Sequence, residues 1–211
     1  MTGIKVQEKK KGWARISRKP FWTTVWLVLI GAVLTYSVAY FTAYILKIPL
    51  FIDTIFTIAL TFYCGPLPAL VSSFLYSVPS SLYVNAPIYI LFNLCTVAIV
   101  YITYALMRYN ERNNNSKLLT FLYLILSALI SGFVSSIIGG CIHTIALVIY
   151  PNVVGEITTE KFVLSLFSKN GSLILSAILG RVPTTCLDRV ITTILGWGLY
   201  KLLLKVEKNH R

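Results

Sequence analysis

Long apolar runs with almost no charged side chains occupy most of this sequence. They are separated by polar residues or by Pro and Gly, and they lie at about 22–46, 50–64, 67–84, 86–107, 118–149 and 172–204. A helix that crosses the ~30 Å hydrocarbon core of a bilayer needs about 20 such residues. The pattern therefore predicts an all-α membrane protein, a bundle of about six transmembrane helices.

The composition excludes a water-soluble fold. Hydrophobic residues fill 56% of the 211 positions and charged residues only 12%, which is more apolar surface than a soluble domain of this length can bury. We therefore expect membrane lipid as a partner. The length accommodates one transmembrane domain over 22–204, with a basic tail at 1–21 and a short tail at 205–211.

Lys and Arg are distributed unevenly around the predicted helices. If both termini lie on one side of the membrane, that side carries fourteen of them, at the two termini and in the loop 108–117. The other side carries three, Lys47, Lys161 and Lys169. Because basic residues favour the cytoplasmic side, we expect both termini in the cytoplasm. The basic residues before the first helix then favour anionic lipid, and not nucleic acid, as a partner.

Familiar catalytic and metal-binding motifs do not occur. The sequence contains no GxxxxGK[ST] phosphate loop, no GxSxG turn, no HExxH motif and no CxxC pair. We expect a protein that is not an enzyme and holds neither a metal nor a cofactor, so that any energy it uses comes from a partner or a gradient. Its cysteines, Cys64, Cys95, Cys141 and Cys186, are predicted to be small core hydrophobes.

Ionisable side chains lie inside the apolar runs, where burial costs several kcal/mol and each needs a partner or a function. They are Asp53, Arg181, Asp188 and Arg189. The last helix carries a polar stripe at helical spacing, which must face the interior of the bundle. The stripe consists of Arg181, Thr184, Thr185, Asp188 and Thr192.

Depth in the membrane predicts how the charges pair. At ~1.5 Å per residue, Arg181 lies about 13 Å from the outer end of its helix and Asp53 about 5 Å, a difference that a long guanidinium spans. We therefore predict an Asp53–Arg181 pair, with Asp188 and Arg189 deeper and nearer the cytoplasm. The alternative is that these charges are purely structural: they neutralise one another and hold the helices in register.

Further polar residues fall in the outer portions of the last three helices, and they converge if those helices adjoin. They predict a substrate pocket that opens to the outside. The predicted binding residues are Asn85, Tyr89, Asn93, His143 and Asn170, together with Arg181. For any single one, a hydrogen bond between helices is the alternative. The outer loop 150–171 is either a lid over this pocket or a connector.

The first helix carries small residues four positions apart. Gly31 with Thr35, and Ala39 with Ala43, have the spacing that lets another helix backbone approach closely. The pattern predicts contact with a partner helix.

Two stretches resemble one family of membrane proteins. The run from Ile48 to Ile55 (IPLFIDTI), followed by Gly65-Pro66 and a helix rich in small residues, resembles the second and third helices of the substrate-binding S components of energy-coupling factor (ECF) transporters. Pro183 followed by Asp188-Arg189 is similar to a Pro, an Asp and a basic residue in the last helix of such proteins.

The resemblance implies one subunit of an ATP-dependent importer in a bacterial cytoplasmic membrane. This subunit would capture a vitamin-like molecule or another micronutrient outside the cell, and it would associate with a membrane coupling subunit and two ATPase subunits. In the family, alanines four residues apart in the first helix contact the coupling subunit. The resemblance implies the same role for Ala39 and Ala43.

The substrate-capture subunit is the first hypothesis, and two other classes of function fit the residues. The second hypothesis is a membrane sensor or regulatory input module without transport activity. The third is an intramembrane enzyme that uses Asp53, Asp188 or His143, which their different predicted depths disfavour.

Overall fold

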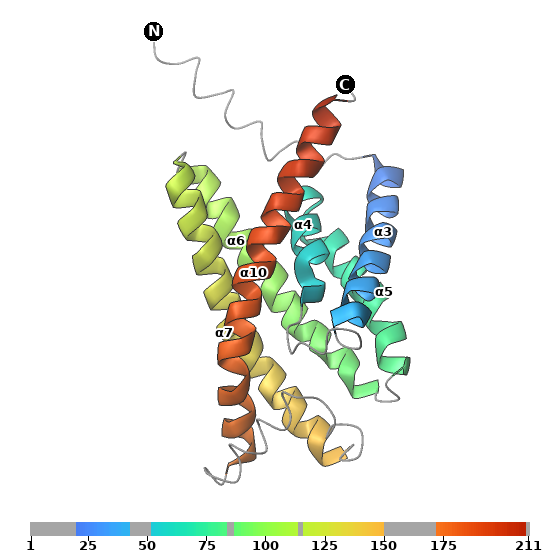
Figure 1. The fold of residues 1–211 in the computed structure, drawn as a ribbon, viewed down its shortest axis with the longest axis vertical. Coiled ribbons are helices and arrows are strands. Elements are labelled where there is room, and N and C mark those ends of the chain that lie inside the picture. The colour runs from blue at the N-terminus through green and yellow to red at the C-terminus, as the bar shows by residue number, and fades with distance from the viewer. Residues whose placement is uncertain (1–19, 43–51, 84–86, 114–115, 150–171, 210–211) are drawn as a thin grey trace.

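Helices make up all the regular structure of the described chain. The computed structural model describes residues 20–42, 52–83, 87–113, 116–149 and 172–209 (Figure 1). The elements are α3 (Phe21–Tyr40), the short 3₁₀ helix η3 (Ile52–Thr54), α4 (Ile55–Tyr63), α5 (Pro66–Tyr83), the 3₁₀ helix η4 (Pro87–Phe92), α6 (Asn93–Asn113), α7 (Lys117–Ile149) and α10 (Leu173–Asn209). Each apolar run thus contains one of these six α-helices, so the predicted all-helical class is confirmed for this part of the chain.

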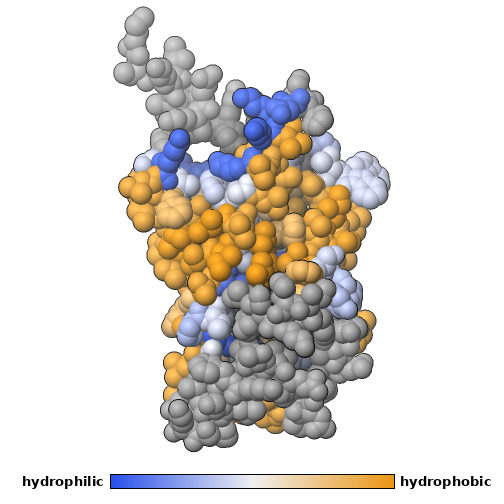
Figure 2. All heavy atoms as spheres, in the orientation of Figure 1, coloured by the Kyte–Doolittle hydropathy of each residue, from blue (hydrophilic) through white to orange (hydrophobic). Residues whose placement is uncertain are grey.

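The helical surface is apolar where a soluble protein is polar. Three segments, α3, Pro87–Asn113 and α7, are long and apolar enough to cross a membrane. Trp22 and Trp26 on α3 are 72% and 63% exposed, among many large apolar side chains on the outside of the bundle. Figure 2 shows a broad band of hydrophobic residues across this face of the bundle. Such a surface has to be covered by lipid, so the chain is membrane-embedded.

The described chain begins and ends at the same end of the bundle (Figure 1). We call it the terminal end; the opposite end, where α7 stops at Ile149 and α10 begins at Leu173, is the distal end. Exposed basic side chains gather at the terminal end, where Figure 2 shows hydrophilic residues beyond the apolar band. They include Arg108, Arg112, Lys117, Lys201, Lys205 and Lys208.

Helix α4 lies at the centre of the terminal half. It packs against α3, α5, α6 and α10, and every residue from Thr57 to Tyr63 is buried. With η3 it is about 18 Å long, short of the ~30 Å hydrocarbon core. Because other helices surround it, α4 needs no polar face, and its apolar run marks a core helix.

A glycine ends α4 and lets α5 turn back. Cys64 closes α4 with a backbone hydrogen bond to Leu60 O at 2.8 Å, and Gly65 follows with φ of +96°. This left-handed conformation is accessible to glycine at little cost. Pro66 then begins α5, a position that needs no N–H donor.

We predict that Gly65→Ala lowers stability by about 1–2 kcal/mol, because an alanine is strained at positive φ. A Cβ at Gly65 meets nothing within 4 Å, so the loss would come from the backbone alone. Gly198 in α10 also has open space around it, but it is helical. Gly198→Ala is therefore the control. In thermal unfolding in detergent, the midpoint of this variant should equal or exceed that of the wild type. Equal midpoints for the two variants would contradict the assigned turn.

Small residues bring α7 close to α10. A Cβ on Gly140 would lie 2.6 Å from Ile178 Cγ1 and 3.1 Å from Ile178 Cα, and one on Gly132 would lie 3.0 Å from Cys186 Cα. Both glycines are buried, as are the small residues around them on the same face of α7. This close approach aligns the distal halves of α7 and α10, which carry the polar residues described below.

The small residues of α3 face helices of the same chain. Gly31 and Thr35 are buried, and a Cβ on Gly31 would lie 2.8 Å from Leu60 Cδ1 and 3.0 Å from Ser72 Oγ. These two positions therefore serve packing on α4 and α5 and are not exposed to an outside helix. Ala39 is half-buried, and Ala43 lies outside the described residues.

Candidate functional site

The polar stripe of α10 faces inward, as predicted. Thr185, Asp188 and Thr192 are 7%, 1% and 0% exposed, while Arg181 and Thr184 are half-buried. The opposite face of α10 carries exposed apolar side chains such as Leu187. The hydroxyl of Thr192 donates to Asp188 O at 2.8 Å and that of Thr184 to Arg181 O at 3.0 Å, so the helix itself satisfies them.

A charged network ties the middle of α10 to η3. Arg189 Nη2 lies 3.1 Å from Asp188 Oδ2, and Arg189 also donates to the hydroxyl of Thr54. Asp188 and Arg189 thus form an ion pair in the core. Their buried position and the hydrogen bond from Arg189 to Thr54 fit a structural function, which is the alternative given above for the charges.

The Asp53–Arg181 pair does not form. Asp53 instead accepts a hydrogen bond from Tyr76 Oη at 3.1 Å, which joins η3 to α5. Arg181 binds a different partner on α7. The prediction was wrong because depth along the bundle says nothing about rotation: Asp53 and Arg181 are directed toward different helices.

Arg181 pairs with His143. Its Nη2 lies 2.8 Å from Nδ1 of His143, and the histidine is fully buried at 0% exposure. Because a guanidinium only donates, Nδ1 must accept, and the imidazole is therefore neutral with its proton on Nε2. Buried Nε2 has no hydrogen-bond partner among the residues that the structure describes. The site thus contains an N–H donor held in one direction by the bond at Nδ1.

Aromatic and small residues surround this pair. The guanidinium of Arg181 lies 5.2 Å from the ring centroid of Phe92 in η4, and Phe92 stacks on Tyr89 at 5.6 Å between centroids. The cation–π contact compensates part of the cost of burying the charge. A Cβ on Gly139 would lie 3.4 Å from Arg181 Nη1 and 3.5 Å from both Phe92 Cε1 and Cys95 Sγ. A glycine at this position therefore leaves room for the guanidinium between α7 and η4.

Asn93 does not belong to this cluster. Its amide donates to Ser77 Oγ at 2.5 Å and to Ile90 O at 3.0 Å, and its Oδ1 accepts from Ser73 Oγ at 3.1 Å. It therefore joins α6 to α5 by hydrogen bonds between helices, the alternative considered for each polar residue. Asn85 and Asn170, also predicted to bind substrate, lie outside the described residues, as does the loop 150–171.

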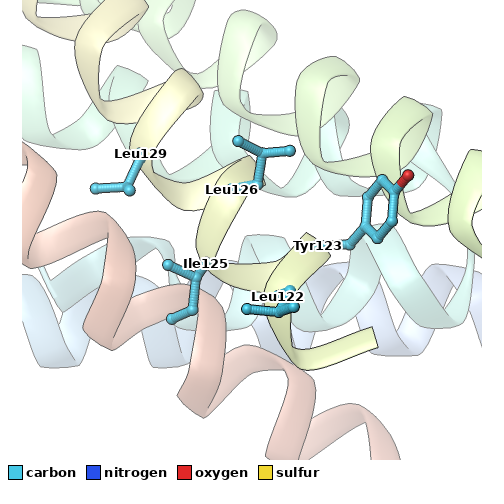
Figure 3. Close-up of a pocket in the computed structure, with 5 residues that line it drawn as sticks. All are labelled: Leu122, Tyr123, Ile125, Leu126 and Leu129. Carbon is cyan, nitrogen blue, oxygen red and sulfur yellow. The ribbon is translucent and has the colours of Figure 1, made fainter. Parts of the chain in front are cut away.

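A groove on the outside of α7 carries no such chemistry. It is an open hollow lined by apolar side chains and one tyrosine, and Figure 3 shows them along one stretch of the helix. The lining residues are Leu122, Tyr123, Ile125, Leu126 and Leu129. The stretch ends fourteen residues, about 21 Å along the helix, before His143. Such a surface fits acyl chains and not a polar solute.

Metal-binding clusters are not found in the part of the chain that the structure describes. Its four cysteines are free thiols. Cys141 is exposed and thus differs from the predicted core position, whereas Cys95 Sγ contacts Ser135 O at 3.5 Å beside the Arg181 cluster.

Sequence reasoning missed three members of the cluster: Phe92, Cys95 and Gly139. Phe92 and Cys95 have no distinguishing pattern among many apolar residues. Gly139 belongs to a signal that is visible in the sequence, small residues recurring every four positions along α7. These are Ser131, Ser135 and Gly139, with Gly132, Ser136 and Gly140 beside them.

The structure therefore brings together Arg181, His143 and Tyr89 of the predicted binding residues, at the junction of η4, α7 and α10 in the distal half. A neutral histidine held by an arginine, beside aromatic rings, can hold a small polar molecule by hydrogen bonds and has no nucleophile–base pair in its described contacts. Comparisons with protein-family models, with curated proteins and with solved structures found no match to this chain.

Proposed function

We propose that this chain is the substrate-capture subunit of an ECF-type importer. It binds a vitamin-like or other small micronutrient at the Arg181 cluster and delivers it with a membrane coupling subunit and two ATPase subunits. The observation that carries the proposal is the pair formed by half-buried Arg181 and fully buried His143 in the distal half of a membrane-embedded bundle. Ionisable groups at such depth are costly, and they mark solute pathways or binding sites in membrane proteins.

The family resemblance supports the same function from other residues. The run Ile48–Ile55 and the set Pro183, Asp188 and Arg189 are those that resemble S components. In the fold, Asp188 and Arg189 join η3 to α10, so the motif supports the scaffold of the site. The solute itself would contact Arg181, His143 and Tyr89.

The orientation is part of the proposal. The bundle of about six helices lies in the bacterial cytoplasmic membrane, with α4 enclosed by the others, and its terminal end faces the cytoplasm, because the basic side chains gather there. The distal end, and with it the Arg181 cluster, then faces outward. Reporter fusions at either terminus should be active only inside the cell; an active fusion outside would reverse the orientation and remove the outward-facing site.

Co-purification tests the partnership. Tagged chain, expressed with the coupling subunit and ATPases of its host, should elute with them as one complex from a detergent column. A matched variant, Val33→Trp, adds bulk without charge to the side of α3 where Val33 is 65% exposed; loss of the complex in this variant would show that the partner contacts that surface. Failure of the wild-type chain to associate with every coupling module of its host would overturn the proposal.

A further inference from the structure

The unpartnered N–H of His143 identifies the kind of ligand. We infer that the captured solute carries an anionic oxygen, such as a carboxylate, which accepts a hydrogen bond from His143 Nε2, with the positive charge of Arg181 behind the ring. This inference rests on the proposed function and specifies the substrate class of the same site.

The donor is fixed in identity. Arg181 Nη2 at 2.8 Å from Nδ1 allows only the tautomer with hydrogen on Nε2. A protonated imidazolium is also excluded, since its Nδ1 would face the guanidinium as a second donor. The ring therefore presents one acceptor, which is used, and one donor, which is not.

The donor is also fixed in direction. Within the described residues, the hydroxyls of Thr103 and Thr193 and Nε of Arg189 are likewise buried without a hydrogen-bond partner. A hydroxyl rotates to suit its surroundings, and the guanidinium of Arg189 already contacts Thr54 and Asp188 through its other two nitrogens. The imidazole of His143 is held by Arg181 and cannot turn toward another acceptor without losing that bond. Because native proteins rarely leave a buried N–H unpaired, and no described residue accepts from this one, the position suits an acceptor supplied by a bound solute.

The charge of the acceptor follows from the arginine. The guanidinium polarises the imidazole through Nδ1 and makes Nε2–H a stronger donor. An anionic oxygen on Nε2 also gains Coulomb attraction from Arg181, which is strong where water is excluded. His143 is fully buried, so the oxygen must belong to a molecule that the protein encloses, as a captured solute would be.

Two substitutions separate the functions of the two ring nitrogens. His143→Asn keeps an oxygen near the position of Nδ1, which can still accept from Arg181, and it removes the far donor. His143→Gln reaches further and places an amide N–H near the position of Nε2. If the Nε2–H bond carries recognition, Asn should weaken binding about 10-fold or more, and Gln should recover part of it.

The experiment uses the full chain in detergent. A small-molecule extract of its producing cells is divided by anion exchange into retained and unretained fractions, and the protein is incubated with each, desalted and weighed by native mass spectrometry. The wild type should keep a small acidic molecule from the retained fraction. His143→Asn should lose it, and His143→Gln should hold an intermediate amount.

The outcomes distinguish the inference from the proposed function. Three results would overturn the inference: capture of a molecule only from the unretained fraction, equal capture of the acid by His143→Asn, or retention of a phospholipid alone. The proposed function would survive each of them, because the chain could still capture a different solute. Capture of nothing by folded wild type overturns both. The tautomer can be measured independently of how well His143→Asn folds. In a His210→Gln chain, His143 is the one remaining histidine of the sequence, so ¹⁵N-histidine NMR reports which of its ring nitrogens carries the proton. A proton on Nδ1 would contradict the assigned donor.

Discussion

Replacing Asp188 with leucine is expected to lower the free energy of unfolding by about 3–5 kcal/mol. Asp188 is 1% exposed, and its carboxylate lies 3.1 Å from Arg189, itself 6% exposed. In this variant the guanidinium of Arg189 keeps its hydrogen bond to the hydroxyl of Thr54 but loses its ion pair with Asp188 while it stays in the core. The thermal midpoint and the monodisperse fraction in detergent should both fall.

The double variant Asp188→Leu/Arg189→Met provides the decisive comparison. Because it removes both charges and keeps apolar volume, it should recover most of the loss, since an ion pair replaced by apolar residues is often neutral or stabilising. Lys205→Met, at an exposed position of the same helix, should change stability by less than about 0.5 kcal/mol. A double variant as unstable as Asp188→Leu would show that the pair is not the source of the effect.

Replacing Gly140 with leucine should separate α7 from α10. Its Cβ alone would lie 2.6 Å from Ile178 Cγ1 and 3.1 Å from Ile178 N and Cα, so rotation of one side chain cannot relieve the contact. Backbone overlap of this kind costs at least the ~1–3 kcal/mol of ordinary overpacking. Because the same helix face carries His143, ligand capture should be lost together with stability.

Gly198→Leu is the matched control. A Cβ there meets nothing within 4 Å, and the position is exposed on the outside of α10. The same glycine-to-leucine change should therefore leave the thermal midpoint and ligand capture unchanged. If Gly140→Leu retained both properties, the close packing of α7 on α10 would be wrong.

The helices could be predicted from the sequence because lipid imposes a simple rule. Apolar runs and the Gly65-Pro66 turn located the six α-helices of the described residues, and the spacing of Thr185, Asp188 and Thr192 predicted the inward face of α10. Both signals depend only on local periodicity and on the cost of exposing polar groups to hydrocarbon. The ends were less accurate: α10 continues to Asn209, beyond the predicted 204.

The partners of polar side chains could not be predicted in the same way. Depth placed Asp53 near Arg181, yet Asp53 bonds to Tyr76 and Arg181 to His143. Asn93 was expected in the pocket and instead joins Ser73 and Ser77. Pairing depends on how each helix is rotated, and that rotation is set by close contacts of small residues such as Gly140. Sequence spacing within one helix does not contain this information.

Close packing also explains how the site combines charge with stability. The network of Asp188 and Arg189 holds α10 against η3 in the middle of the helix, and the glycines of α7 hold its distal half. Arg181 and His143 therefore lie on supported helices, and under the proposed function their side chains are already in position when a solute binds. Such preorganisation lowers the cost of ordering a binding site.

Native mass spectrometry of the chain purified directly from membranes tests solute capture at Arg181 most directly. The wild type should carry a small non-lipid molecule, and Arg181→Met, which keeps the length of the side chain without its charge, should be folded and empty. A wild type that carries only lipid, or an Arg181→Met chain that retains the same molecule in equal amount, would contradict capture at this site.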